Sequence, residues 1–400
     1  MKLHNNLLVT SEKCIDEIMN GGRLASLVIK DAFLANKKLG GRDRRFVAET
    51  VYDVVRNFRL LANISFRRDY TKGDPVREMI MNYLYLFKAE DFPQLKDEAE
   101  KITALKAAYD NYKGIRKIRE SVPDWLDLKG EEELGERWEK ELSRLNEQAQ
   151  LIIRVNTLKT GRESLIAELK KEDIPASALE GYPEACTVDQ RKNLYASQAF
   201  RNGLFEVQDA SSQLVAPFLK PEKNLRVIDA CAGAGGKSLH LAALMKNSGK
   251  IISMDVDEWK LKELQRRAKR NGISNIETRL IDSGKTIKRL ENSADRLLLD
   301  VPCSGSGVLR RNPDAKWRLT PEELERLKQL QQDILDRYTR VLKSGGLLVY
   351  ATCSIFPSEN EKQVEKLLAA HEEFRLEDQV NISPYESGFD GFFIARMRKL

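Results

Sequence analysis

Apolar side chains in the first 145 residues recur at spacings of three and four, the period of an amphipathic helix. The clearest run covers 42–64, where Phe46, Val47, Val51 and Val54 fall on one face. The pattern predicts helices over 11–19, 24–38, 42–64, 75–87, 96–112 and 131–149. Because strand patterns are nearly absent here, we expect a helical bundle, with 114–130 as a connection to the next module.

The pattern changes after residue 150 to short apolar runs. A small α+β unit ending near Pro217 is predicted from strands at 151–155, 186–188 and 204–207 and a helix at 162–171. Beyond Pro221 strands are predicted at 226–228, 250–254, 276–281, 296–299 and 347–351, and helices at 237–245, 258–271, 321–342 and 359–370. This alternation predicts a parallel, doubly wound α/β sheet. We expect domains over 1–145, 146–216 and 217–400.

Composition excludes several classes of protein. No apolar run approaches the roughly 18 residues that span a bilayer, and the start lacks the apolar segment of a secretory signal. Five cysteines without a CxxC pair, and three histidines, argue against a disulfide framework or a metal site. We therefore expect reduced thiols, no metal, no membrane association and a cytoplasmic location. The net charge of +6 permits a nucleic-acid partner without requiring one.

Basic side chains gather in two places. They are Lys260, Lys262, Arg266, Arg267, Lys269 and Arg270 in one predicted helix, and Arg310, Arg311, Lys316 and Arg318 in a later segment. A basic helix is most often a solvated face. Cations near a reacting nucleobase would instead contact phosphates.

A glycine-rich turn joins the strand at 226–228 to the following helix. It consists of Cys231, Ala232, Gly233, Ala234, Gly235, Gly236 and Lys237. Glycines let the backbone pass close to a ligand, and a helix start offers free N–H groups. Asp255 ends the next strand and can accept hydrogen bonds from ribose hydroxyls, and Asp282 ends the third strand, where an adenine edge would lie. These positions predict a site for an adenosine-containing cofactor.

Both NAD and S-adenosylmethionine carry an adenosine. The turn lacks the full GxGxxG spacing that cradles a pyrophosphate, and histidines that could donate protons to a reduced substrate are scarce. S-adenosylmethionine has no pyrophosphate, so the pattern favours it.

Cys303 and Cys353 each follow an apolar run, at the carboxyl end of a predicted strand where ligands bind. The plain alternative is that these small side chains only pack. Two thiols beside a methyl-donor site fit methylation of cytosine C5, which becomes nucleophilic once a thiolate has added to C6. Asp300 would support the addition by hydrogen bonding, and Lys237 or the sulfonium would favour the thiolate. These residues leave open which thiol attacks.

The segments DACAGAGGKS (229–238), LLLDVPCSGSGVLRRNPDAKW (297–317) and YATCSIFPSENE (350–361) resemble the motifs of the Nop2/Sun (Fmu) family of RNA cytosine-C5 methyltransferases. RVNTLK (154–159), FEVQDASS (205–212) and DGFFIARMRK (390–399) extend the resemblance over about 150–400. In the helical front, GRDRRFVAETVYDVVRN (41–57) and SVPDWL (121–126) resemble the NusB-like domain of the bacterial member that modifies small-subunit ribosomal RNA.

The resemblance implies a NusB-like RNA-binding domain, a small α+β RNA-binding unit and a Rossmann-like methyltransferase domain, in that order. It implies that Cys353 attacks C6, that Cys303 assists product release, and that Asp300 and Lys237 belong to the catalytic site. Asp300 would also contact the cofactor. DNA cytosine methyltransferases use the other cysteine. The family turn usually reads CAAPGGKT, so Gly233 and Ala234 depart from it.

The implied partner is RNA, most specifically small-subunit ribosomal RNA, and the implied assembly is a monomer. Transfer RNA as the substrate, or a non-catalytic role as an RNA-binding assembly factor, are the alternatives at this point.

Overall fold

The computed structural model describes residues 3–65, 74–188 and 194–400, which form two compact units. The helical unit comprises the described residues up to Glu147 together with Leu309–Pro321. The catalytic unit comprises the described residues of Gln148–Val308 and Glu322–Leu400. The three-part division at residues 145 and 216 stays a prediction. No helix in the described ranges is both long and apolar enough to cross a membrane.

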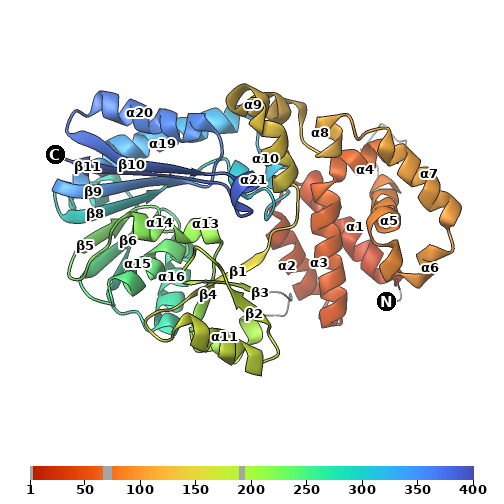
Figure 1. The fold of residues 1–400 in the computed structure, drawn as a ribbon, viewed down its shortest axis with the longest axis horizontal. Helices are drawn as coiled ribbons and strands as arrows, with labels where there is room; N and C mark the ends of the chain where they lie inside the picture. The colour runs from red at the N-terminus through yellow and green to blue at the C-terminus, as the bar shows by residue number, and fades with distance from the viewer. Residues whose placement is uncertain (1–2, 66–73, 189–193) are drawn as a thin grey trace. The chain divides into compact units, whose positions relative to one another are not determined.

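Short helices build the helical unit, and those from α1 to α7 are coloured red to orange in Figure 1. They are α1 (Asn5–Met19), α2 (Ala25–Ala35), α3 (Gly41–Arg56), α4 (Phe58–Ile64), α5 (Asp74–Phe87), α6 (Pro93–Lys96), α7 (Ala99–Asp110), α8 (Arg116–Arg119), α9 (Asp124–Leu134), α10 (Arg137–Leu145) and α18 (Ala315–Arg318). The face predicted from spacing is buried: Phe46, Val47, Val51 and Val54 belong to one core cluster. The helical prediction for this part of the chain is confirmed.

Several predicted boundaries in this unit are wrong. The run predicted at 42–64 is interrupted at Asn57, which separates α3 from α4. The helix predicted at 131–149 is two helices, because Gly135 adopts a φ of +56° between α9 and α10. The connection predicted at 114–130 contains α8 and the start of α9, which begins directly after Pro123. Proline presets the backbone for a helix start, a signal that apolar spacing does not contain.

The small sheet of the catalytic unit has the order β2-β3-β1-β4, with antiparallel neighbours. Its strands are β1 (Leu151–Val155), β2 (Ala176–Ala178), β3 (Ala185–Val188) and β4 (Phe205–Val207), and its helices are α11 (Arg162–Lys171) and α12 (Gln198–Arg201). Leu165 and Leu169 of α11 pack with Ile153 and Phe205 in its core. Strand β2 was not predicted, since its three residues are mostly exposed and carry no alternating pattern.

The large sheet has the order β10-β11-β9-β8-β5-β6-β7. The strands are β5 (Arg226–Asp229), β6 (Lys250–Asp255), β7 (Ile276–Leu280), β8 (Ala294–Asp300), β9 (Leu342–Thr352), β10 (Phe374–Ile382) and β11 (Phe392–Lys399). Strands β5 to β9 pair in parallel, as predicted. The two last strands were not predicted and pair antiparallel, so the sheet is mixed.

Helices cover both faces of this sheet (Figure 1). The remaining helices of the catalytic unit are α13 (Ala210–Gln213), α14 (Val215–Phe218), α15 (Gly236–Leu244), α16 (Glu258–Asn271), α17 (Gly284–Lys288), α19 (Pro321–Tyr338), α20 (Glu361–Ala370) and α21 (Pro384–Ser387). Successive strand residues point to opposite faces. Ile228 and Leu297 pack with α19 and α20, whereas Val227 and Leu298 pack with α14, α15 and α16. Because β5 to β9 run parallel, their carboxyl ends lie at one common edge of the sheet, and the candidate residues lie at that edge.

Candidate functional site

The cofactor turn connects β5 to α15 and has an unusual backbone. Gly233 and Gly235 have φ values of +52° and +88°, a conformation that glycine adopts without strain. A Cβ at Gly235 would lie 2.5 Å from Leu264 Cγ of α16, so this position also requires glycine for close packing. A Cβ at Gly233 or Gly236 would meet no atom within 4 Å. The turn is thus packed against α16 on one side and open on the other.

Asp255, at the end of β6, holds this turn in place. Its carboxylate accepts hydrogen bonds from the Gly233 amide at 2.8 Å and the Asp257 amide at 2.9 Å. The structure therefore brings Asp255 and the turn together, as the sequence predicted. A carboxylate has about four acceptor positions, so capacity remains for ribose hydroxyls.

Asp282 lies just beyond the end of β7 and is exposed. Its carboxylate accepts hydrogen bonds from the Thr286 hydroxyl at 2.9 Å and the Ser283 hydroxyl at 3.1 Å, at the start of α17. These bonds lower the pKa of Asp282. The backbone here runs beside Asp255, because the Ile281 amide donates to the Asp255 carbonyl at 2.9 Å.

Lys237 and Asp300 form an ion pair at the same edge. Lys237 Nζ donates to Asp300 Oδ2 at 2.6 Å and lies 5.3 Å from the centre of the Phe392 ring. The Asp300 side chain is 28% exposed, so it stays accessible to a ligand. A carboxylate and an ammonium group are thereby presented side by side.

The two candidate thiols are in contact. Cys303 Sγ and Cys353 Sγ lie 3.2 Å apart, on loops that follow the neighbouring strands β8 and β9. The loops are joined by hydrogen bonds from the Val301 amide to the Ala351 carbonyl at 3.0 Å and from the Gly307 amide to the Cys353 carbonyl at 2.9 Å. The hydrogen bond with Cys353, burial and nearby negative charge raise the pKa of Cys303. Cys303 is therefore the thiol that retains its proton more strongly than a free cysteine.

Two arginines, one buried and one half-buried, support the cofactor turn, a role that the sequence did not predict for them. Arg154 of β1 donates to the Gly236 carbonyl at 2.8 Å, and Arg267 of α16 donates to the Ala234 carbonyl at 2.7 Å. Glu206 of β4 pairs with Arg267 at 2.9 Å. Burial lowers the pKa of Arg154 to about 10. The signal was present, since Arg154 and Glu206 interrupt apolar strand segments where a charge needs a partner.

Several of the basic residues singled out from the sequence form ion pairs within the protein. Arg267 and Arg270 of α16 pair with buried Glu206, while Lys260, Lys262 and Arg266 pair with acids of the same helix or its cap. In the helical unit, Lys316 is 2% exposed and cannot contact a phosphate in this conformation. The phosphate-binding hypothesis is therefore wrong for Lys316, because the chain buries it among backbone carbonyls.

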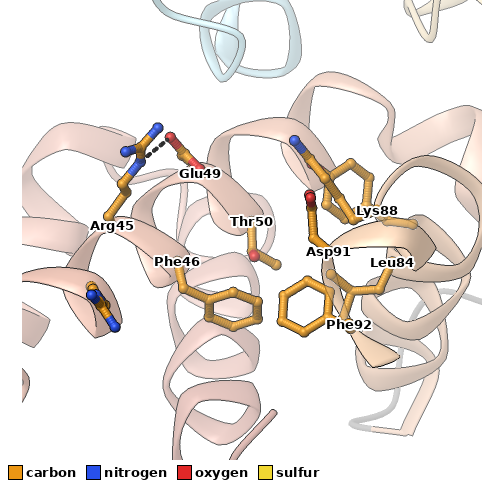
Figure 2. Close-up of a pocket in the computed structure, with 10 residues that line it drawn as sticks. Arg45, Phe46, Glu49, Thr50, Leu84, Lys88, Asp91 and Phe92 are labelled. Atoms are coloured by element: carbon orange, nitrogen blue, oxygen red, sulfur yellow. Dashed lines mark hydrogen bonds and ion pairs between the residues drawn. The ribbon is translucent and has the colours of Figure 1, made fainter. Parts of the chain in front are cut away.

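The helical unit contains a cavity of about 210 Å³ between α3 and the end of α5 (Figure 2). The rings of Phe46 and Phe92 meet edge to face at 5.7 Å in its floor. Cationic residues among those lining it are Arg42, Arg45 and Lys88. Arg45 is paired with Glu49 at 2.9 Å, so the rim carries both signs of charge.

Comparison with known proteins gives matches along nearly the whole chain. Residues 216–398 match the family described as 16S rRNA methyltransferase RsmB/F, and residues 122–195 match its ferredoxin-like domain. A protein of Synechocystis sp. named probable ribosomal RNA small subunit methyltransferase B is 32% identical, covering 92% of this chain and 94% of its own length.

Solved structures agree with this similarity. The crystal structure of PH0851 covers 100% of both chains with a TM-score of 0.82 at 28% identity. A methyltransferase homologue from Pyrococcus horikoshii covers 71% of this chain and 98% of its own, with a TM-score of 0.64 at 28% identity. The similarity therefore includes the helical front as well as the catalytic unit.

Proposed function

The chain belongs to the RsmB/F family of 16S rRNA methyltransferases, and from this membership we propose that it methylates C5 of a cytosine in small-subunit ribosomal RNA, with S-adenosylmethionine as the donor. The observation that carries the proposal is the contact of Cys303 and Cys353, 3.2 Å apart at the end of adjacent parallel strands. Cytosine C5 is not itself nucleophilic. A thiol that adds to the ring overcomes this limitation.

The residues present fit S-adenosylmethionine. Open space beside Gly233 and Gly236 leaves room for the cofactor, and Asp255 offers acceptors to ribose hydroxyls. Asp282, beyond the end of β7, is the residue we assign to the adenine edge. When bound, the cofactor supplies an electrophilic methyl group on a sulfonium sulfur.

We assign the attack to Cys353. Its thiolate forms a bond to C6, the C5–C6 π bond breaks, and the electron pair moves into the ring, which makes C5 nucleophilic. Lys237 would stabilise the negative charge that develops on the ring by donating a hydrogen bond at its polar edge, and Asp300 would orient the ring by accepting a hydrogen bond from the exocyclic amine. Once C5 carries the methyl group, a base such as water takes the C5 proton. That electron pair restores the double bond, and the sulfur leaves as a thiolate.

Cys303 assists the leaving step in this scheme. Its raised pKa and its contact with Cys353 suit a thiol that donates a hydrogen bond to the departing sulfur. The 3.2 Å separation of the two sulfur atoms does not distinguish the roles of the two cysteines. The assignment of roles therefore rests on the groups around each thiol.

The two cysteines should give different phenotypes when replaced. Cys353→Ala should abolish methyl transfer and form no covalent RNA adduct. In Cys303→Ala, Cys353 should still add to the ring and C5 should still accept the methyl group. The reaction should then stall as a protein–RNA adduct that survives denaturing electrophoresis. Cys186→Ala, in the small sheet, controls for loss of a thiol and should behave like wild type. An adduct in Cys353→Ala and none in Cys303→Ala would reverse the assignment.

Small-subunit ribosomal RNA as the substrate can be tested directly. A strain lacking this protein should lose 5-methylcytosine at a position in that RNA, and the purified protein should restore it. Loss of the modification from transfer RNA alone would overturn this part of the proposal.

We also propose that the protein acts as a monomer in the cytoplasm and that its helical unit docks RNA. The cavity rim carries Arg42 and Lys88, cations that can contact phosphates. Replacing both by Gln should weaken RNA binding and reduce its dependence on salt, while cofactor affinity stays unchanged. Light scattering of the protein alone should give the monomer mass.

A further inference from the structure

Glu359 is a buried carboxylate beneath the two cysteine loops. It ends a short turn between β9 and α20 and is 0% exposed. Four donors reach its two oxygens: the Ser304 amide at 2.8 Å, the Ser304 hydroxyl at 2.5 Å, the Ser354 hydroxyl at 2.5 Å and the Gln331 amide at 3.0 Å. A buried charge is tolerated when its oxygens are satisfied in this way.

These donors come from the residues that directly follow the two thiols. Ser304 follows Cys303 and Ser354 follows Cys353, and both hydroxyls bind the same oxygen, Oε2 of Glu359. One carboxylate oxygen therefore ties together two loops whose cysteines are 50 residues apart in the chain.

Further bonds fix Glu359 itself. The Tyr350 hydroxyl donates to the Glu359 carbonyl at 2.6 Å, which holds its backbone against β9. Gln331 of α19 donates both to Glu359 and to the Pro302 carbonyl at 3.0 Å, next to Cys303. The carboxylate thus cannot shift without moving the loop that carries Cys303.

The four donors that bind the Glu359 carboxylate are uncharged, so its negative charge acts on nearby groups. It contributes to the raised pKa of Cys303. A proton that stays on Cys303 can be shared with the Cys353 sulfur across the 3.2 Å contact.

We propose that Glu359 is a positioning residue that holds the two cysteine loops in thiol contact and directs the shared proton to Cys303, leaving Cys353 to attack. The proposal rests on the proposed function for the identity of the substrate. The distribution of the proton between the two thiols does not depend on the identity of the substrate, and it can be measured without RNA.

The first test is alkylation of the free protein with iodoacetamide across a pH series, with mass spectrometry of the two cysteine peptides. In wild type Cys303 should react only at higher pH than a free cysteine does. Glu359→Gln removes the negative charge, so Cys303 should react roughly tenfold faster at a given pH. Glu365→Gln, an exposed change on α20 with the same loss of charge, should behave like wild type. Unchanged reactivity of Cys303 in folded Glu359→Gln would overturn the proposal.

The second test separates the effect of the charge at position 359 from the effect of the length of its side chain. Glu359→Asp keeps the charge but is one methylene shorter, so Cys303 should stay slow to alkylate while kcat falls about 100-fold from loss of loop alignment. Glu359→Gln should lower kcat similarly with KM unchanged. If Glu359→Gln does not fold, the Ser354→Ala variant tests the positioning role instead. It removes one hydrogen-bond donor to the Glu359 carboxylate and should lower kcat without changing KM. Wild-type kcat in folded variants would overturn the positioning role.

The two proposals fail in distinguishable ways. If wild type does not methylate ribosomal RNA, the proposed function fails, and the alkylation series still measures which thiol holds the proton. Faster alkylation of Cys303 in Glu359→Gln would then support the inference about proton placement on its own.

Discussion

Asp229 ends strand β5 with its carboxyl group fully buried behind the cofactor turn. The Ser238 hydroxyl donates to it at 2.6 Å, and the Ser253 hydroxyl donates in turn to Ser238 at 2.8 Å. Burial, opposed by the Ser238 bond, raises the pKa of Asp229 from 3.8 to about 7. The folded state therefore holds this proton at pH values where the unfolded chain has lost it.

The raised pKa predicts how stability depends on pH. Because the folded pKa exceeds the unfolded one, the free energy of unfolding should fall as pH rises from about 4 to 7. Asp229→Asn carries no charge at any pH and keeps an acceptor for Ser238. Its stability relative to wild type should thus increase by about 2 kcal/mol between pH 5 and 7.5, measured by urea unfolding. A difference that does not change with pH would show that Asp229 titrates normally.

Asp255 lies at the cofactor turn and offers a second test. Asp255→Ala removes the acceptor of the Gly233 amide as well as the proposed acceptor of the ribose. Affinity for S-adenosylmethionine should fall by about 1.5–3 kcal/mol, measured by calorimetric titration. Glu365→Ala, exposed on α20, is a control for loss of a carboxylate. Unchanged affinity in a folded Asp255→Ala protein would move the ribose site elsewhere.

Strand β1 and helix α16 show how elements outside the cofactor site shape it. Neither carries a predicted cofactor residue, yet Arg154 and Arg267 hold two successive parts of the turn by its carbonyls. Glu206 of β4 pairs with Arg267 and sits in contact with Arg270. The small sheet is therefore part of the support of the cofactor turn, in addition to any contact with RNA.

Removing one of these supports should weaken cofactor binding. Arg154→Met has similar bulk but leaves the Gly236 carbonyl without this donor. The dissociation constant for S-adenosylmethionine should rise by roughly tenfold, equivalent to about 1.4 kcal/mol. Arg201→Met, an exposed change on α12, should have no effect. Equal affinity in the two variants would show that the turn holds its shape without Arg154.

The path of the chain complicates a simple division into domains. Residues 309–321, which begin six positions after Cys303, belong to the helical unit. Lys316 Nζ donates to the Arg56 carbonyl at 2.7 Å, the Glu120 carbonyl at 3.2 Å and the Asn146 side chain at 3.1 Å. Trp317 donates to the Val55 carbonyl at 2.8 Å. Deletion of residues 1–145 would remove Val55, Arg56 and Glu120, and with them three of these four acceptors, so point variants are the better test of docking.

Lys316 should be essential to this arrangement. Lys316→Met fills similar space but leaves two buried carbonyls and the half-buried Asn146 side chain without their shared donor, which should lower the free energy of unfolding by about 2–4 kcal/mol. Urea unfolding followed by tryptophan fluorescence measures the change. Lys366→Met, exposed on α20, should be neutral. A neutral Lys316→Met variant would show that the segment is held by its apolar contacts alone.

Local patterns were sufficient for much of this protein. Apolar spacing predicted the helical front and the core face of α3, and the alternation of strands and helices predicted the parallel strands β5 to β9. The positions of Asp255, Asp300, Cys303 and Cys353, each at or directly after an apolar run, predicted that they lie at strand ends. Because the carboxyl ends of parallel strands share one edge, such positions converge whatever the details of packing. The roles of these residues in catalysis remain predictions.

Features that depend on partners distant in the chain were not accessible in this way. Strands β10 and β11 exist because β9 offers β11 an antiparallel edge, and their own residues do not alternate clearly. Lys316 and Glu359 carry charges that the local sequence pattern places at the surface. The partners of Lys316 lie 170 to 260 residues away, and those of Glu359 include Gln331 and Ser304, 28 and 55 residues away, so only folding could show that these charges are buried and satisfied. Burial of a charge is a property of its surroundings, and the surroundings are assembled by the fold.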